Sequence, residues 1–336
     1  MTGGPRPVRL VTARRSNEAS SYKIYTDKMF RSLTAAGRPA VTVREVDMGA
    51  EGRRGGVLRP TFRHLFGRFP RDGAIYHATE PNTALRGVDV VTFHDLYAFD
   101  ASGPAFRIFR YVIRSAARRA RRIVTQAPSI REDIRRHLGA AAADRTRIVP
   151  PAFPAPPPGR RPEAYDVLWV GSLDARKRPD QFLERLAERR GAPLRVAFLC
   201  HPGGSPLEPS VRAALSRIGD RHHVDWIVDN VSTERLDELY RSARAFVSTS
   251  IVEGFHYPVM EAYSRGTPVV LPRTSPYPET YGSVVGVHYY EPSGGFDAAL
   301  DEALAEGPVV PDGALLDSIS YASVGRRLSA VYDELG

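Results

Sequence analysis

The chain has 336 residues, of which 42% are hydrophobic and 25% are charged, and its formal net charge is +9. This composition excludes a disordered or fibrous protein, and the length predicts two domains of roughly 150 residues each. No apolar run approaches the ~20 residues that a membrane-spanning helix needs, and the N-terminus shows no signal-peptide pattern. With Cys200 as its single cysteine, the chain fits a reducing compartment, and we expect a cytoplasmic protein.

Apolar runs alternate with amphipathic ones through the first half of the chain, which predicts short buried strands separated by helices. The predicted strands are Val8 to Thr12, Val41 to Val46, Ala74 to His77, Val88 to Phe93 and Ile123 to Thr125. The predicted helices are Tyr22 to Ala36, Phe106 to Arg119 and Ser129 to Leu138, the last with Ser129 and Glu132 as a capping box and Gly139 as its stop. Such alternation indicates a parallel sheet covered by helices on both faces.

Proline is so dense in VPPAFPAPPPGRRPEAY, residues 149 to 165, that neither helix nor sheet can propagate, so this segment is predicted to be an interdomain linker. The alternation then restarts and predicts a second parallel sheet. Its predicted strands are Val167 to Val170, Arg195 to Leu199, Val224 to Val228, Ala245 to Ser248, Val269 to Leu271 and Val284 to Val287. Its predicted helices are Pro179 to Arg190, Pro209 to Ile218, Thr233 to Ser242 and Phe296 to Ala305, and a last helix follows at Tyr321 to Leu335.

The segment from 106 to 122 combines large apolar residues with several arginines. One interpretation is a membrane-surface helix, because basic amphipathic helices bind anionic headgroups. The plainer interpretation is a helix that covers the sheet and keeps its arginines on the outer side. No nucleic-acid-binding module accompanies the positive charge, so we expect no nucleic-acid partner.

Two loop segments in the second half carry candidate chemistry. EGFHYPVMEAYSRGTP, residues 253 to 268, sets Glu253 and Glu261 around a turn, with a helix predicted to start near Pro258 and free backbone N–H groups before it. The alternative is that Glu253 is a solvated loop charge and that Glu261 complements the helix dipole. Arg176 and Lys177 follow the strand that ends at Gly171, where cations are well placed for a phosphate, unless both simply face solvent.

Several blocks, in order and spacing, closely resemble the retaining GT-B glycosyltransferases of family four, the group with the Glu-x7-Glu motif. In the second half these blocks are VGSLDARK, ERLDELYRSARAFVSTS, EGFHYPVMEAYSRGTPVV and PETYG. In the first half VVTFHDL and RRIVTQAPSIREDIRRHLG resemble the family's N-terminal domain, and YASVGRRLSAVYDEL resembles its closing helix. The resemblance implies two Rossmann-like domains facing a central cleft, at 1–155 on the acceptor side and 156–317 on the donor side. Residues 318–336 would cross back to the first domain.

The resemblance also implies roles for individual residues. Glu253 would contact hydroxyls of the donor sugar and stabilise the oxocarbenium-like transition state. The loop amides of Gly254, Phe255 and His256 would approach the sugar and diphosphate, and Glu261 would bind the ribose. Lys177, helped by Arg176 beside the strand-end Gly171, would neutralise the diphosphate. His94 would lie near the donor sugar and the attacking hydroxyl, although a structural role at its strand end is the alternative.

The activity that follows from this resemblance is transfer of a hexose-type sugar, with retention, from a nucleotide diphosphate sugar to an acceptor hydroxyl of a small molecule, a glycan or a lipid-linked glycan. Contact with the inner membrane surface would fit a lipid-linked acceptor. No metal is expected, because the sequence holds no Asp-x-Asp pair and no zinc-ligand spacing, and no other cofactor is expected. The alternatives are a catalytically weak binding subunit, a sugar-nucleotide epimerase and a phosphorylase.

The chain departs from the family pattern at three places. His256 and Tyr257 stand where the family's EGFG motif has glycine and an aliphatic residue, which is expected to reshape the donor-sugar pocket. Ser172 follows Gly171 where an arginine is common. RRSNEASS, residues 14 to 21, replaces a glycine-rich turn, so Ser20, Ser21 and Tyr22 are expected to face the acceptor.

Overall fold

The computed structural model describes residues 4–14, 21–47, 63–154, 156, 159–200, 205–228 and 231–336. None of the helices in this part of the chain combines the length and the hydropathy that a membrane-spanning helix requires. Ser20 lies outside the described residues, as does the side chain of Ser21, so the expectation for this turn stays a prediction. The chain divides into two compact units, the first made of residues 1–154 and 317–336 and the second of residues 155–316.

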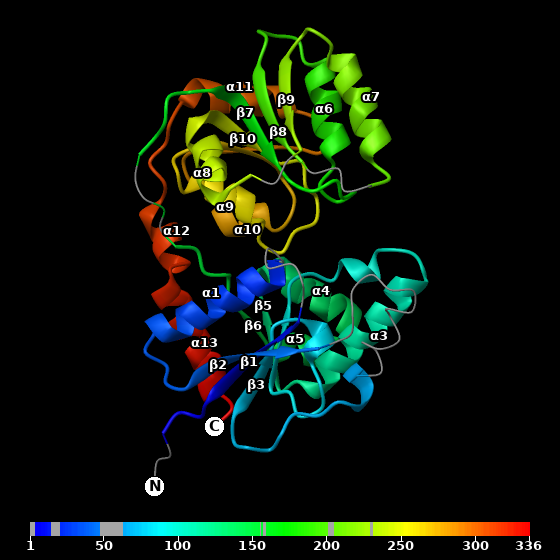
Figure 1. The fold of residues 1–336 in the computed structure, drawn as a ribbon, viewed down its shortest axis with the longest axis vertical. Helices are drawn as coiled ribbons and strands as arrows, with labels where there is room; N and C mark the ends of the chain where they lie inside the picture. Colours follow the sequence, from blue (N-terminus) through cyan, green and yellow to red (C-terminus); the bar gives the residue numbers. More distant parts are fainter. Residues whose placement is uncertain are drawn as a thin grey trace. The chain divides into compact units, whose positions relative to one another are not determined.

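The first unit is built on a six-stranded sheet in the order β2-β1-β3-β4-β5-β6, and every neighbouring pair is parallel (Figure 1). The strands are β1 (Val8–Ala13), β2 (Val41–Val46), β3 (Ile75–Ala78), β4 (Val90–Phe93), β5 (Arg122–Thr125) and β6 (Thr146–Ile148). The helices are α1 (Ser21–Ala35), α3 (Pro104–Arg119), α4 (Pro128–Leu138), α5 (Ala140–Asp144) and α13 (Tyr321–Asp333), with short 3-10 turns at Pro81–Thr83 and Tyr97–Phe99.

Helices cover both faces of this sheet, as the continuous apolar strands require. One hydrophobic cluster joins the sheet to α3, α4 and α5, and a second joins it to α1 and α13. In the second cluster the final helix, red in Figure 1, packs beside the blue α1. The predicted return of the last helix to the first domain is therefore confirmed.

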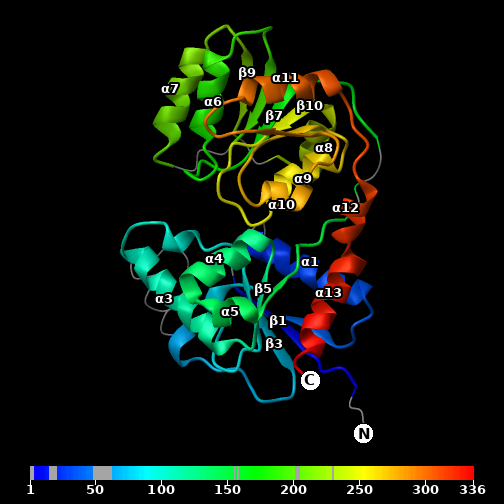
Figure 2. The same cartoon turned by 180° about the vertical axis from the view of Figure 1, so that it is seen from behind.

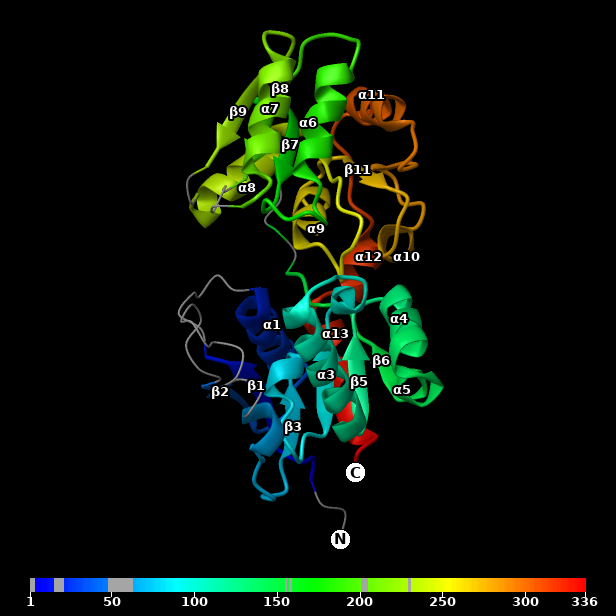
Figure 3. The ribbon, with the colours of Figure 1, turned by 90° about the vertical axis from the view of Figure 1, so that its right-hand side faces the viewer.

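The second unit is also built on a six-stranded parallel sheet, in the order β12-β11-β10-β7-β8-β9 (Figure 2). The strands are β7 (Tyr165–Val170), β8 (Arg195–Leu199), β9 (His223–Ile227), β10 (Ala243–Val247), β11 (Val269–Pro272) and β12 (Val287–Tyr290). The helices are α6 (Pro179–Glu188), α7 (Glu208–Ile218), α8 (Thr233–Ser242), α9 (Tyr257–Tyr263), α10 (Tyr277–Tyr281) and α11 (Phe296–Glu306), and α12 (Gly313–Ser318) spans the boundary between residues 316 and 317. A core cluster packs α6, α7 and α11 against the sheet, α8 contacts β7 and β10, and α9 contacts β10 and β11 (Figure 3). The predicted fold class, two parallel α/β sheets, is confirmed.

Two local predictions are wrong, and one strand was not predicted. The Ser129–Glu132 capping box does not form, because α4 begins at Pro128 with Ala127 as its N-cap and no side chain capping it. The last strand starts at Val287 and not at Val284, because α10 and a turn at Gly286 occupy the preceding residues. Strand β6 was not predicted, since its three residues are too few to show a period.

Helix α3 has the structure that the plainer interpretation predicts. Its inner side buries Ile113, Ala116 and Ala117 against the sheet. Its outer side exposes Arg107, Tyr111, Arg114 and Arg118, which recur at helical spacing.

Candidate functional site

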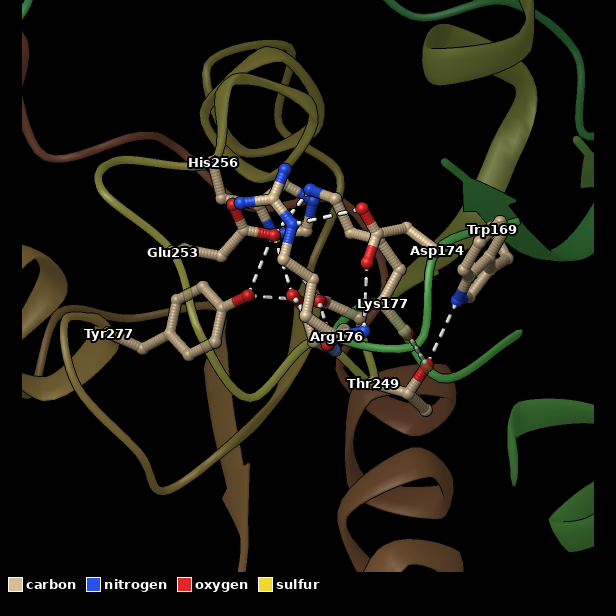
Figure 4. A network of polar contacts seen from close by, with 10 residues as sticks. Trp169, Asp174, Arg176, Lys177, Thr249, Glu253, His256 and Tyr277 are labelled. Atoms are coloured by element: carbon tan, nitrogen blue, oxygen red, sulfur yellow. Dashed lines mark hydrogen bonds and ion pairs between the residues drawn. The ribbon is translucent and has the colours of Figure 1, made fainter. Parts of the chain in front are cut away.

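Two loops at the carboxyl edge of the second sheet bring the predicted donor-side residues together. Residues 171 to 178 follow β7, and residues 248 to 256 follow β10, which is paired with β7 in the sheet. Ligands of parallel α/β sheets bind at this edge, because the loops that follow the strands meet there. Figure 4 shows the polar network that links the two loops.

Hydrogen bonds from the second loop fix the backbone of the first. The Thr249 hydroxyl accepts from the indole N–H of Trp169 at 3.2 Å and donates to the carbonyl of Lys177 at 2.8 Å (Figure 4). The backbone N–H of Ile251 donates to the carbonyl of Arg176 at 3.0 Å. The loop that carries both cations is thereby held by groups from two neighbouring strand ends.

Gly171 is required by the close approach of the Trp169 ring. A Cβ atom placed at Gly171 would lie 2.5 Å from the indole, which is itself buried against Phe182 and Phe198. Real Cβ atoms do not approach a neighbouring atom so closely, and this packed ring has no room to retreat. The glycine therefore allows Trp169 to reach Thr249 and support the Lys177 loop.

Lys177 and Glu253 form an ion pair between these loops (Figure 4). Their side chains are 14% and 8% exposed, and the Ser250 hydroxyl donates a further hydrogen bond to the Glu253 carboxylate at 2.6 Å. Burial raises the pKa of Glu253. The positive charges of protonated His256 and of Lys177, with hydrogen bonds from Lys177 and Ser250, have the larger opposite effect and lower this pKa to about 2. Because the His256 ring is itself neutral at pH 7, the Lys177 ammonium is the charge that keeps Glu253 ionised there.

Arg176 lies on the same loop and is paired with Asp174. Its guanidinium Nε donates to the Asp174 carboxylate at 3.2 Å, and its backbone N–H donates to the same carboxyl group at 3.0 Å. The Arg176 side chain is 29% exposed, so it is the more accessible of the two predicted phosphate-binding cations.

His256 is buried beside Glu253 rather than directed to solvent. Its Nδ1 lies 2.7 Å from the Tyr277 hydroxyl, 3.3 Å from the Ser248 hydroxyl and 3.9 Å from the Glu253 carboxylate. Burial, with the positive charge of Lys177, lowers the pKa of His256 to about 3. The ring is therefore neutral at physiological pH.

The remaining donor-side residues surround the start of α9. Phe255 is buried and packs edge-on against Tyr257, with ring centroids 5.3 Å apart, while Gly254 is partly exposed beside it. Glu261 is partly exposed on α9. Burial and the nearby charge of Glu261 raise the pKa of the Tyr240 hydroxyl well above its usual value.

His94 lies in the first unit, and both of its ring nitrogens are occupied there. Nε2 donates to the carbonyl of Thr79 at 2.8 Å, and Nδ1 accepts from the side-chain amide of Gln126 at 2.7 Å. The ring also packs edge-on against Tyr22 and Tyr25. These contacts fix one neutral tautomer and match the structural role that the sequence left as an alternative.

Sequence reasoning missed six residues of the network, namely Trp169, Asp174, Ser248, Thr249, Ser250 and Tyr277. None belongs to a spacing that predicts a site, although Thr249 and Ser250 end the strand-like run before Glu253. Across the described ranges, no group of three or more histidine, cysteine or acidic side chains is arranged to hold a metal ion.

Comparison with known proteins finds a family match within the second unit. Residues 156–308 match the family described as "Glycosyl transferases group 1". A relative from Catenulispora acidiphila, "D-inositol 3-phosphate glycosyltransferase 2", is 36% identical over 122 residues, which is 34% of this chain. The match spans 29% of that relative's length, so the chain covers less than a third of it.

Similarity to solved structures extends over almost the whole chain. The lipopolysaccharide outer core galactosyltransferase WaaB superposes with a TM-score of 0.67 at 12% identity, covering 98% of this chain and 100% of that one. Anabaena HepE in complex with UDP-glucose superposes with a TM-score of 0.61 at 13% identity, covering 97% and 94%. Residues 156–308 thus carry a glycosyl transferases group 1 domain, and the chain as a whole has the GT-B fold.

Proposed function

We propose that this protein is a retaining, metal-independent glycosyltransferase of family four that uses a nucleotide diphosphate hexose as donor. The observation that carries the proposal is the buried Lys177–Glu253 pair at the carboxyl edge of the second sheet. The pair places an ionised carboxylate beside an ammonium group at the edge where α/β sheets bind ligands. A sugar diphosphate needs both, because its hydroxyls donate to a carboxylate and its phosphates bind a cation. The complex of HepE with UDP-glucose supports a nucleotide sugar as the donor class.

Each donor-side residue has a role in this proposal. Lys177 and Arg176 neutralise the diphosphate, in place of a divalent ion, because charge-assisted bonds to phosphate oxygens are strong. Glu253 accepts hydrogen bonds from sugar hydroxyls and stabilises positive charge at the anomeric carbon. Glu261 accepts from the ribose hydroxyls, and the loop amides at Gly254 and Phe255 approach the sugar and diphosphate.

The reaction exchanges one bond at the anomeric carbon for another. The bond from this carbon to the diphosphate oxygen breaks, and a bond to the acceptor oxygen forms on the same face of the sugar. The acceptor hydroxyl proton passes to the departing diphosphate oxygen, so the products are the glycoside and the nucleoside diphosphate. Retention by this route needs no protein nucleophile.

The test is a thermal-shift screen of the protein against UDP, GDP, ADP and dTDP sugars, followed by turnover assays with the nucleotide sugar that binds. Ligand at a hundred times its dissociation constant stabilises the folded state by about 2.7 kcal/mol. Glu253→Gln is expected to lower turnover by at least about a hundredfold, a loss typical of removing one transition-state-stabilising group. The matched control is Glu208→Gln on α7, whose exposed pairing with Arg212 lies outside this network.

The products separate the proposal from its alternatives. A retained glycoside made only in the presence of acceptor supports it. Dependence on free phosphate would indicate a phosphorylase, and an isomerised nucleotide sugar formed without acceptor would indicate an epimerase. Binding without turnover or donor hydrolysis would indicate a binding subunit.

We also propose peripheral contact with anionic membranes through the outer stripe of α3. Arg107, Arg114 and Arg118 supply exposed positive charge beside Tyr111, which is 47% exposed. Basic residues near an anionic surface contribute about 1 kcal/mol each. Binding to vesicles of phosphatidylglycerol, and its loss in an Arg107→Glu, Arg114→Glu variant, would support the contact; equal sedimentation of both proteins would contradict it.

A further inference from the structure

His256 has a backbone conformation that its side chain does not favour. Its φ of 59° lies in the left-handed region, where a residue with a Cβ is sterically disfavoured. Such residues persist where surrounding contacts hold them, and they cluster at functional sites. The backbone of His256 is held in this conformation by the contacts of its side-chain ring, which is buried with an exposure of 3%.

Two hydroxyl groups surround one nitrogen of the ring. Nδ1 of His256 lies 2.7 Å from the Tyr277 hydroxyl and 3.3 Å from the Ser248 hydroxyl, and these two hydroxyls lie 3.0 Å apart. The Ser248 hydroxyl also accepts from the backbone N–H of Ser250 at 3.2 Å. With the Tyr277 hydroxyl donating to Nδ1, the proton of the neutral ring is on Nε2.

This Nε2–H group has no protein partner. It is buried, and no other described residue accepts a hydrogen bond from it. Buried donors in folded proteins are paired, so an unpaired one beside a candidate site indicates a ligand atom that accepts. The ring stays neutral in this role, because burial and Lys177 lower the pKa of His256 to about 3.

The imidazole that carries this donor lies beside the ionised Glu253. Its other nitrogen, Nδ1, is 3.9 Å from the Glu253 carboxylate, whose side chain is only 8% exposed. A phosphate oxygen accepts hydrogen bonds but is repelled by a carboxylate, so it fits poorly between the two groups. A hydroxyl group both donates and accepts, and it matches a donor beside an acceptor.

We propose that His256 is a specificity-determining residue, whose Nε2–H donates to the same donor-sugar hydroxyl that donates to Glu253. The inference rests on the proposed function, because it assumes a sugar in this site. Tyr277 is then a positioning residue, since it holds the ring in the Nε2–H tautomer. His256 and Glu253 together favour the binding of a sugar that carries this hydroxyl over one that lacks it.

The experiment compares the affinity for a nucleotide sugar with that for its free nucleoside diphosphate. The probes are UDP-glucose and UDP, or the corresponding pair from the screen of GDP, ADP and dTDP sugars if those bind instead, measured by calorimetry. His256→Gly, which relieves the left-handed backbone, is expected to weaken nucleotide-sugar binding by about fivefold to twentyfold. Binding of the free diphosphate should stay within about twofold, as it lacks the sugar hydroxyl.

A second arm identifies the hydroxyl. Wild-type protein is titrated with deoxy analogues of the bound sugar, one for each hydroxyl. One analogue is expected to bind more weakly than the parent sugar, and His256→Gly should abolish that difference, because the lost hydrogen bond is the same one. If wild type and His256→Gly show the same affinity difference between the parent sugar and that deoxy analogue, the inference is overturned.

Two tyrosines of α10 supply a matched pair of variants that leave His256 in place. Tyr277→Phe removes the hydroxyl that fixes the tautomer and is expected to weaken sugar binding, with a mixture of tautomers in the ¹⁵N spectrum of the ring. Tyr281→Phe is the control, because its hydroxyl is also buried but has no hydrogen-bond partner among the described residues. Equal effects of the two substitutions would contradict a positioning role for Tyr277.

Failure of the inference is distinguishable from failure of the proposed function. If wild-type protein binds no nucleotide sugar of the panel, the proposed function fails and the inference fails with it. If wild-type protein binds one and His256→Gly weakens the sugar and the free diphosphate equally, only the inference fails. The ring would then hold the loop without touching the sugar.

Discussion

The ammonium of Lys177 contacts the carboxylate of Glu253, although the two residues lie 76 positions apart in the chain. Parallel pairing of β7 with β10 places the loops that carry them side by side at one edge of the sheet. Both side chains are largely withdrawn from water, so each charge depends on the other for its stabilisation. The two residues proposed to bind the donor therefore also contribute to the stability of the second unit.

Lys177→Met is expected to lower the free energy of unfolding by about 3 kcal/mol, because it leaves the buried Glu253 carboxylate without its cation. It should also raise the pKa of Glu253. Urea denaturation measures the first effect, and the double variant Lys177→Met, Glu253→Gln should recover part of the loss, since it removes the stranded charge. Arg212→Met is the control: its side chain is 62% exposed and its pairing with Glu208 is expected to contribute about 0.5 kcal/mol or less. A similar loss in both single variants would contradict the burial of the Lys177 pair.

The pH dependence of stability should report the neutral His256 ring. Its pKa is about 3 in the folded protein against an ordinary value of 6.5, so the unfolded chain binds a proton first as the pH falls. The stabilisation is present above pH 6.5 and is lost as the pH falls from 6.5 towards 3. Buried His64 and His77, with pKa values lowered to about 4 and about 3 by burial, act in the same direction.

The measurement compares wild type with His256→Asn, which does not titrate and tolerates the left-handed backbone. One proton corresponds to at most about 1.4 kcal/mol per pH unit. Between pH 6 and pH 4, the unfolding free energy of wild type should therefore fall more steeply, by about 1 kcal/mol per pH unit. Parallel curves for the two proteins would show that the ring protonates equally in both states.

His94→Ala is expected to destabilise the first unit by about 2 kcal/mol, because the Thr79 carbonyl and the Gln126 amide both lose their partner. The control is His223→Ala, whose ring is 72% exposed and whose loss should change stability by about 0.5 kcal/mol. Thermal unfolding compares the two variants. A His94→Ala protein as stable as wild type would favour a purely catalytic role for this ring.

Gly325→Ala tests the crossing of α13 over α1. A Cβ atom at Gly325 would lie 1.9 Å from the carbonyl oxygen of Ser32 and 2.8 Å from the Cβ of Ala36, so the helices must separate. We expect the free energy of unfolding to fall by about 2 to 3 kcal/mol, the usual range for overpacking. Arg326→Ala, at the exposed neighbouring position, should change it by about 0.5 kcal/mol or less. Equal stability of Gly325→Ala and wild type would show that the two helices have room to adjust.

The order of residues along the chain was enough to predict the parallel α/β architecture and the loops that carry the candidate site. Buried strands leave continuous apolar runs, and their alternation with helical periods is a local property that a single sequence displays. This is why β7, β10 and the start of α9 were predicted within a few residues, and why Lys177 and Glu253 were expected at strand ends. Segments with too few residues for a period, such as β6, were not predictable in this way.

Which of these residues come into contact depends on the three-dimensional fold. The ion pair of Lys177 with Glu253 depends on β7 and β10 being neighbours, and the support of their loops depends on Trp169 reaching Thr249. The ring of His256 is held by Tyr277, which is the first residue of helix α10. Strand order, burial and hydrogen-bond direction are set by contacts between distant parts of the chain, and no local pattern of residues records them.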